Sequence, residues 1–536
     1  EWWKLEVKEA MTEKKIEGIN VEKILSGEKE IDGITATEIS TQLGVPMHPR
    51  FLHFYKYLSK NELENLCIAA QKAKAVFEEE NISGAYLENT PETKKALEKI
   101  LLPHKVDENG IFVDKQYAYT FLKTLGFFSK RMPSEEKEAL ENLSEISGIT
   151  IIDKAGTFIG ARMGRPEAAK PRKMVGNPHC LFPIGIAGGS TRSINKAAQK
   201  QSIEVEMAYN LCTNCKKTLP QPFCQDCMQR TLLVYYCEKC RKFVQNEKCS
   251  NCQGETSAFQ KTNIQVDGLF EQAAKNLRIK MPELVKGVRG LINARKVSEP
   301  LEKGILRASH GLHIFRDATI RFEMLNAPIT HFKAREIGTS VEKLKEMGYT
   351  HDYKGKLLEN DEQLLEIFPQ DIIVNDEALE FFYKVTQFVD DELEKFYQKK
   401  PFFEKHDKSE MIGELVLGLA PHTSAAILGR IIGTTKARVC FAHPFFHLTK
   451  RRNVDGDQDS IMLLMDSLLN FSEYYLPSTR GGRMDAPLVF TIALNPLEID
   501  DEAYEIETCE EYPLKLYQSA LKNAPPFTVE MDRVAK

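Results

Sequence analysis

The chain lacks a long uninterrupted apolar segment and a strong excess of charge of one sign. Its longest apolar stretch, residues 411–433, is interrupted by Glu414, Pro421, His422 and Arg430, so we do not expect it to span a membrane. No secretory signal is evident at the N-terminus. The formal net charge is -5, which gives no overall signature of nucleic-acid binding. We therefore expect a cytoplasmic protein without a membrane segment, in which any anion-binding surface is local.

The remaining composition is that of an ordinary globular protein. Hydrophobic residues make up 42% and charged residues 28% of the 536 positions. This length predicts roughly three or four domains. Because the chain begins with Glu1 rather than Met, we expect it to be a fragment of a larger polypeptide.

Eight of the twelve cysteines lie in one short segment and form four CxxC pairs. These are Cys212, Cys215, Cys224, Cys227, Cys237, Cys240, Cys249 and Cys252. Two such pairs can complete a tetrahedral Cys₄ zinc site, in which no position stays open for a substrate. Each cysteine of the first two pairs recurs 25 residues later, which favours one structural zinc in 212–227 and another in 237–252. A disulfide framework is the alternative, and a long chain without a secretory signal argues against it.

Residues 453–459 form an acidic segment, Asn-Val-Asp-Gly-Asp-Gln-Asp, directly after Lys-Arg-Arg at 450–452. Carboxylates at alternate positions point to one side of an extended loop, and Gly456 lets the backbone curl between two of them. Mg²⁺ prefers such oxygen ligands, and the basic run would suit an anionic substrate. We expect the loop to lie between a strand at 437–442 and a helix at 461–475. A solvated acidic turn is the alternative interpretation.

A second local feature is the basic segment 161–200. It has a single acidic residue, Glu167, and eight basic ones: Arg162, Arg165, Lys170, Arg172, Lys173, Arg192, Lys196 and Lys200. So one-sided a segment usually has an anionic partner, although a solvated loop would have the same composition. Within it, Gly188–Arg192 could bring backbone N–H groups near phosphate.

Taken together, these motifs resemble the large subunit of archaeal family D DNA polymerase. Residues 453–457 are similar to the metal-binding loop of multisubunit RNA polymerases, but Asn453 replaces the first aspartate, as in family D. The paired cysteine motifs also fit that subunit. So do Lys-Pro-Arg-Lys at 170–173, Gly-Ile-Ala-Gly-Gly-Ser-Thr-Arg at 185–192 and Phe-Ala-His-Pro-Phe-Phe-His at 441–447. The resemblance runs along essentially the whole chain, in the same order.

The resemblance implies an α+β multidomain fold. Two double-psi β-barrels would form the polymerase core, with inserted Cys₄ zinc knuckles and helical peripheral domains. The expected parts are a mainly helical N-terminal region (1–125), a first barrel segment with the basic loop (126–205), two zinc knuckles (206–258), a mixed α/β connecting or DNA-clamp region (259–410), a second barrel with the metal loop (411–500) and a C-terminal segment (501–536).

The activity implied is DNA synthesis in replication, by two-metal nucleotidyl transfer from a dNTP to a primer 3′-hydroxyl. Asp455, Asp457 and Asn453 would be Mg²⁺ ligands, and Lys170 and Lys173 would neutralise charge on the triphosphate.

The resemblance also implies roles for neighbouring residues. Substrate or DNA would contact Arg162, Arg165, Arg172, Arg192, Arg451 and Arg452. We expect Asp459 to be an acid at the surface or behind the ligands. His443 and His447 could orient the loop, although a structural role is the simpler expectation for both.

The expected partners are primer–template DNA, dNTP and a small subunit with a phosphoesterase-type 3′→5′ exonuclease. A sliding clamp would bind through a C-terminal region beyond this chain. Two alternatives stay open from the sequence. One is an RNA-synthesising two-barrel polymerase, because the sequence does not fix the sugar of the substrate. The other is a non-catalytic, zinc-stabilised nucleic-acid-binding scaffold.

Overall fold

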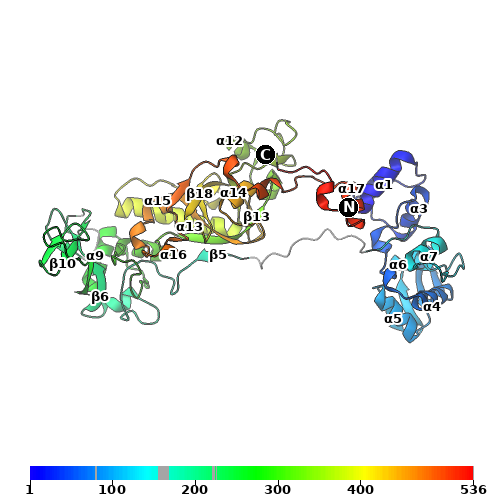
Figure 1. Cartoon of the computed structure of the whole chain (residues 1–536), viewed down its shortest axis with the longest axis horizontal. Coiled ribbons are helices and arrows are strands. Elements are labelled where there is room, and N and C mark those ends of the chain that lie inside the picture. The colour runs from blue at the N-terminus through cyan, green and yellow to red at the C-terminus, as the bar shows by residue number, and fades with distance from the viewer. Residues whose placement is uncertain (79–80, 155–167, 220–223, 225, 228, 535–536) are drawn as a thin grey trace. The chain divides into compact units, whose positions relative to one another are not determined.

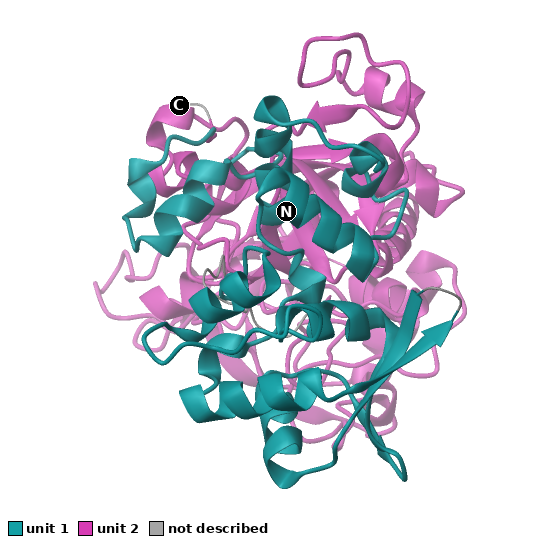
Figure 2. Cartoon of the chain, turned by 90° about the vertical axis from the view of Figure 1, so that its right-hand side faces the viewer, with its two compact units in different colours: residues 1–161, 507–532 teal, residues 162–506, 533–536 magenta. Residues whose placement is uncertain are grey.

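A computed structural model describes the chain except for residues 79–80, 155–167, 220–223, 225, 228 and 535–536 (Figure 1). The chain forms two compact units. Unit 1 contains residues 1–161 and 507–532, and unit 2 contains residues 162–506 and 533–536 (Figure 2). No helix in the described parts of the chain is long and apolar enough to cross a membrane.

Unit 1 combines helices with a four-stranded antiparallel sheet of order β1-β2-β4-β3. Side-chain caps start several helices; Ser59 and Glu62, for example, form a reciprocal capping box at α4. The helices are α1 (Trp2–Glu13), α2 (Val21–Leu25), α3 (Gly33–Leu43), α4 (Lys60–Gln71), α5 (Pro91–Lys99), α6 (Lys115–Thr124), α7 (Ala139–Ser147) and α17 (Leu514–Leu521). The strands are β1 (Lys74–Glu78), β2 (Asn81–Leu87), β3 (Lys105–Asp107) and β4 (Gly110–Asp114).

The centre of unit 2 is an eight-stranded mixed sheet. Its strands are β5 (Ala169–Arg172), β13 (Arg321–Pro328), β16 (Asp371–Asn375), β17 (Leu415–Leu419), β18 (Ala425–Thr435), β19 (Val439–Ala442), β20 (Gln458–Leu463) and β21 (Val489–Thr491). Six of them pair in a closed cycle, β16-β19-β13-β20-β17-β18, because β16 pairs with both β19 and β18. The fold is therefore mixed α and β with a cyclic strand arrangement, while the pair of double-psi barrels stays a prediction.

Helix α14 (Pro444–Thr449) is anchored to this sheet by a fully buried phenylalanine. Phe446 lies against β17 and β18 where both strands have a glycine. A Cβ atom on Gly418 would come within 2.7 Å of the Phe446 ring, and one on Gly429 within 3.1 Å. A side chain at Gly418 would therefore displace the ring, and one at Gly429 would crowd it. The helix that leads into the acidic loop is thereby fixed on the rigid sheet.

The other helices of unit 2 cover the sheet or flank it. α13 (Asp376–Asp391) buries Phe382 and Phe388 in the same core as Phe322 of β13 and Ile461 of β20. Other helices are α8 (Ile194–Ala198), α9 (Val266–Leu277), α10 (Leu301–Ser309), α11 (Ala334–Ile337), α12 (Val341–Glu346), α15 (Leu464–Asn470) and α16 (Arg480–Arg483).

The cysteine-rich segment is built from short strands. β6 (Ile203–Ala208) and β12 (Phe259–Ile264) form an antiparallel ribbon at its base. The remaining strands are β7 (Asn210–Leu211), β8 (Thr218–Leu219), β9 (Leu232–Leu233), β10 (Tyr235–Cys237) and β11 (Lys242–Val244). A separate pair, β14 (His331–Lys333) and β15 (Leu364–Glu366), lies between β13 and β16 in the sequence.

Candidate metal centres and active site

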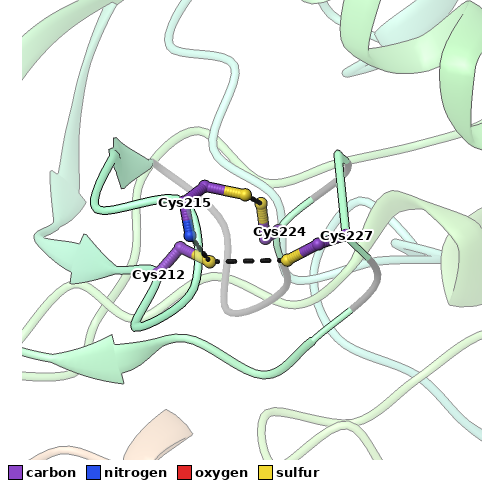
Figure 3. Close-up of side chains that lie close together, drawn as sticks. All are labelled: Cys212, Cys215, Cys224 and Cys227. Carbon is purple, nitrogen blue, oxygen red and sulfur yellow. Dashed lines mark hydrogen bonds between the residues drawn. The ribbon is translucent and has the colours of Figure 1, made fainter.

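The eight clustered cysteines form two four-sulfur sites, divided as the repeat predicts. Residues 212–227 contribute one site and residues 237–252 the other. In the first site, the Cys212 and Cys227 sulfurs lie 3.5 Å apart, and those of Cys215 and Cys224 3.7 Å apart (Figure 3). The second site repeats these values at 3.6 and 3.7 Å. A tetrahedral zinc with Zn–S bonds of 2.3 Å would separate its sulfurs by about 3.8 Å, so both sites fit zinc.

The backbone supports these thiolates in the same way in both knuckles. Lys216 and Arg241, which follow equivalent cysteines, both have left-handed backbones with φ of 57° and 53°. A backbone N–H donates to the first sulfur of each site, at 3.3 Å for Cys212 and 3.5 Å for Cys237. Such N–H donors stabilise the thiolate that metal binding requires. A further N–H, that of Cys252, is the main cause that lowers the pKa of Cys249 to about 6.

The acidic loop lies between a helix and a strand. The strand expected at 437–442 is confirmed as β19, but α14 follows it before the loop begins. After the loop, residues 458–463 form β20, and the helix starts only at Leu464. The expected helix at 461–475 is therefore wrong at both ends: residues 461–463 are strand, and α15 ends at Asn470. A short apolar run does not distinguish a strand from a helix, and here pairing with β13 and β17 decides.

A buried ion pair joins the two ends of this loop. Lys450 Nζ lies 2.5 Å from Asp459 Oδ2, and both side chains are at most 1% exposed. Burial alone would raise the pKa of Asp459, but Lys450 and His447 together outweigh it, through their charge and hydrogen bonds, and hold the pKa of this carboxyl below its usual value. Asp459 was expected at the surface or behind the ligands; the structure excludes the surface, because the side chain is buried.

His447 supports the same pair from α14. Its Nε2 lies 3.1 Å from the carbonyl oxygen of Ala327 on β13, and its Nδ1 lies 3.8 Å from Asp459. Burial lowers the pKa of His447, which favours the neutral ring. His443 instead caps α14 by accepting from the N–H of Phe445 at 3.1 Å.

Asn326 of β13 holds the middle of the loop, and the sequence interpretation missed it. Its amide nitrogen donates to the Asn453 carbonyl at 2.8 Å, and its amide oxygen accepts from the Gly456 N–H at 3.1 Å. Its backbone N–H donates to the Asp457 carbonyl at 2.8 Å. Asn326 is 2% exposed. One buried residue therefore fixes three positions of the loop, and no local motif could have indicated it from 127 residues away.

The loop carries its oxygen groups at or near the surface. Asn453 is exposed, Asp455 and Asp457 are partly buried, and Gly456 has the left-handed backbone, with φ of 89°, that the turn requires. Two carboxylates and an amide oxygen suit Mg²⁺, which takes its remaining ligands from water and phosphate. In the described residues, only the two cysteine sites bring at least three His, Cys, Asp or Glu ligand atoms within 4.8 Å of each other.

The two arginines before the loop differ in their contacts. Arg452 lies 3.2 Å from the Asp457 carboxylate and donates to the Gln458 carbonyl at 3.0 Å, so it stabilises the loop itself. Arg451 is exposed. Binding of substrate or DNA by either residue stays a prediction.

The basic residues upstream lie in different surroundings. Lys170 and Lys173 are exposed. Arg172 pairs with the carboxylates of Glu323 and Asp485, and its guanidinium lies 4.5 Å from the centre of the Phe315 ring. In these contacts its charge is matched within the protein.

The structure gives few contacts for the other arginines that were predicted to bind substrate or DNA. Arg192 donates to the carbonyl of Val175. Arg162 and Arg165 lie outside the described residues.

Strand β13 connects the basic segment to the acidic loop. Glu323 of β13 pairs with Lys170 of β5 on one side and with Ser460 of β20 on the other. Since neighbouring strands lie about 4.8 Å apart, β5 and β20 are separated by about 10 Å. Directly opposed residues share a face of the sheet, so Lys170 lies on the face of Ser460 and Asp459 on the opposite one. The strand register thus places the basic segment on β5 and the strand that follows the acidic loop, β20, on either side of β13. That the basic segment and the loop form one active site stays a prediction.

Comparison with known proteins links this geometry to a family. Two family descriptions match the chain. "DNA polymerase II large subunit DP2, central domain" matches residues 1–246, and "DNA polymerase II large subunit DP2, catalytic domain" matches residues 278–536.

Individual relatives agree. The chain is 40% identical over 522 residues to the DNA polymerase II large subunit of Archaeoglobus fulgidus, covering 94% of this chain and 45% of that protein. For the subunits of Pyrococcus furiosus and Methanococcoides burtonii the identities are 42% over 508 residues and 38% over 552 residues. These matches cover 92% and 100% of this chain, and 40% and 47% of the relatives. The chain thus spans less than half the length of each.

Proposed function

Because the chain belongs to the family of DNA polymerase II large subunits, we propose that it carries the polymerase active site and extends a DNA primer on a DNA template. The observation that carries this proposal is the acidic loop with its supports. A buried ion pair closes its ends, and Asn326 holds its middle. A solvated acidic turn has no need of such supports, whereas a catalytic constellation must be held rigidly.

In this proposal the loop residues bind metal and the basic residues bind phosphate. Asp455, Asp457 and Asn453 would hold Mg²⁺, which when bound activates the attacking hydroxyl and stabilises the leaving oxygen. Lys170 and Lys173 are exposed on the segment that pairs with β13, where they would neutralise triphosphate charge.

The remaining cationic side chains have separate roles in the proposal. Arg451 would contact template or substrate phosphate. Arg452 would keep the Asp457 carboxylate in place, in line with its 3.2 Å contact. Arg172, which pairs with two carboxylates, would orient β5 rather than bind phosphate.

The proposal extends to fold and partners. The closed cycle of six strands would be one of two double-psi barrels, with β5 reaching it from the other. The expected substrates are primer–template DNA and dNTPs. The expected proteins are a small subunit with the 3′→5′ exonuclease and a sliding clamp, both bound by the complete large subunit.

Primer extension by the complete two-subunit enzyme tests the proposal. Asp455→Asn with Asp457→Asn keeps the side-chain shapes but removes both carboxylate charges. Extension should fall at least a hundredfold while primer–template affinity stays within about threefold, because the DNA contacts lie elsewhere. Parallel assays with dNTPs and NTPs separate DNA synthesis from RNA synthesis. Normal extension by this double variant would contradict the assignment of the metal ligands.

A further inference from the structure

A pocket of about 450 Å³ lies between the short strands of the cysteine-rich segment and the β6–β12 ribbon. Its size is within the range of small-ligand sites. The lining residues that carry the argument are Tyr209, Thr218, Tyr236, Phe243, Gln260 and Thr262. None of these residues belongs to the acidic loop or to the zinc ligands, so neither proposed centre accounts for this pocket.

Three aromatic rings form one side of the pocket. Tyr209 lies at its base, with 7% of its surface exposed, and its ring centre is 6.0 Å from that of Tyr236 and 5.2 Å from that of Phe243. Tyr236 and Phe243 meet edge to face at 5.3 Å. Phe243 keeps 42% of its surface exposed. An exposed ring on a buried aromatic base is a platform on which a flat ligand can stack.

The pocket lining also contains polar side chains. The Tyr209 hydroxyl donates to the amide oxygen of Gln260 at 3.1 Å, which fixes the amide at the pocket wall. Thr262, two residues further along β12, and Thr218 add hydroxyl groups. Amides and hydroxyls can donate to and accept from the polar edge of a flat heterocycle. The lining therefore suits a nucleobase better than a purely apolar side chain.

Basic side chains stand next to the pocket in sequence. In each cysteine knuckle the first CxxC pair is followed by two basic residues directly before a pocket residue: 216–217 before Thr218, and 241–242 before Phe243. Lys217 pairs with Asp226 at 2.7 Å, which leaves Lys216, Arg241 and Lys242 for an outside anion. Residues 212–262 together contain eight Lys or Arg and four Asp or Glu. Cations beside a stacking platform are what a flexible, phosphate-linked chain of bases requires.

We propose that this pocket binds an unpaired base of single-stranded DNA. The base stacks on the exposed Phe243 ring, Gln260 contacts its edge, and Lys216, Arg241 and Lys242 contact the flanking phosphates. The inference rests on the proposed function, because the template ahead of the primer end is the unpaired DNA that such an enzyme holds. An apolar side chain of a protein partner is the rival occupant.

Binding of a labelled oligothymidylate to the complete zinc-loaded chain tests this site. Anisotropy is measured without dNTP and without added Mg²⁺, so the result does not depend on catalysis. Phe243→Leu keeps apolar volume but loses the ring, and Phe243→Tyr keeps the ring. Phe402→Leu is the matched control, because Phe402 is a phenylalanine of unit 2 with 58% exposure outside the pocket.

Loss of one stacked base should weaken single-strand binding by about 5- to 150-fold in Phe243→Leu. Phe243→Tyr and Phe402→Leu should bind like the parent chain, and blunt duplex DNA should bind all four proteins alike. Zinc content and thermal unfolding show that each variant is folded. Removal of one base from the oligonucleotide should reproduce the loss at one position.

Several results would overturn the site. One is unchanged single-strand affinity in a folded, zinc-replete Phe243→Leu protein. Another is equal binding of oligonucleotides with and without bases, which would leave phosphate contacts alone. The variant Asp455→Asn with Asp457→Asn should bind single strands normally. Failure of the pocket proposal would therefore appear in the single-strand binding of Phe243→Leu, whereas failure of the proposed catalysis would appear in primer extension by the Asp455/Asp457 variant.

Discussion

Replacing Lys450 with methionine removes the cation that joins the two ends of the acidic loop while keeping the length of the side chain. Asp459, which is 1% exposed, then loses its closest cation and keeps only Arg452, whose Nε lies 3.8 Å from its other carboxylate oxygen. Breaking a buried ion pair in this way typically costs about 3–5 kcal/mol of folding free energy. The matched control is Lys343→Met, which breaks an exposed pair with Glu346 and should cost at most about 1 kcal/mol.

A double variant distinguishes loss of the ion pair from the cost of leaving Asp459 charged and buried. Lys450→Met with Asp459→Asn removes the uncompensated charge, so it should be more stable than Lys450→Met alone. The loss should also depend on pH. Since the pKa of Asp459 lies below its ordinary value, the pair stabilises the fold above about pH 4 and that stabilisation is lost as the pH falls through the folded pKa. The difference between parent and Lys450→Met should therefore shrink on acidification.

Urea unfolding at pH 7 measures these differences. Both tryptophans lie in unit 1, so their fluorescence follows that unit, while hydrogen exchange of β20 amides follows unit 2. Only the second signal should shift in Lys450→Met. A shift no larger than that of Lys343→Met, or a double variant less stable than the single one, would refute the argument from the buried pair.

Three further predictions address the loop, the metals and the basic strand. Asn326→Ala should cost about 1–3 kcal/mol of stability and raise the Mg²⁺ concentration that gives half-maximal extension. A Mg²⁺ titration measures this concentration, with DNA affinity as the control. An unchanged Mg²⁺ requirement would contradict the role of Asn326 in holding the loop. Metal analysis should find two zinc ions per chain, and a chelator should abolish exchange protection in 203–264 but not in β13; an unaltered cysteine segment after complete zinc loss would contradict a structural role. Lys170→Ala with Lys173→Ala should lower the single-turnover rate of dNTP incorporation about tenfold or more, whereas Lys384→Ala should not.

The cysteine sites could be predicted from sequence because metal ligation acts at short range. A CxxC pair fixes two ligands in one turn, and the 25-residue repeat pairs them correctly. The acidic loop was visible for the same reason, since its candidate ligands are neighbours in the chain.

The supports of the loop could not be predicted because they come from distant positions. Asn326 reaches the loop only when β13 pairs with β20, and residues 461–463 become strand only through the pairing of β20 with both β13 and β17. Arg172 belonged to a basic segment in the sequence, yet two carboxylates from β13 and the residues before β21 match its charge. The burial of Asp459 likewise depends on the tertiary fold, in which β20 carries Asp459 and Lys450 pairs with it.

Cleavage of the chain by iron bound in place of Mg²⁺ would test the central claim most directly. With Fe²⁺ and peroxide, radicals formed at the metal cut the nearby backbone. Cuts should appear at 453–457 and at Asn326, and a shared active site adds cuts at 168–173. All of them should disappear in Asp455→Asn with Asp457→Asn. Cuts confined to the cysteine sites, or cuts at the loop that persist in this variant, would contradict a metal centre on Asp455 and Asp457.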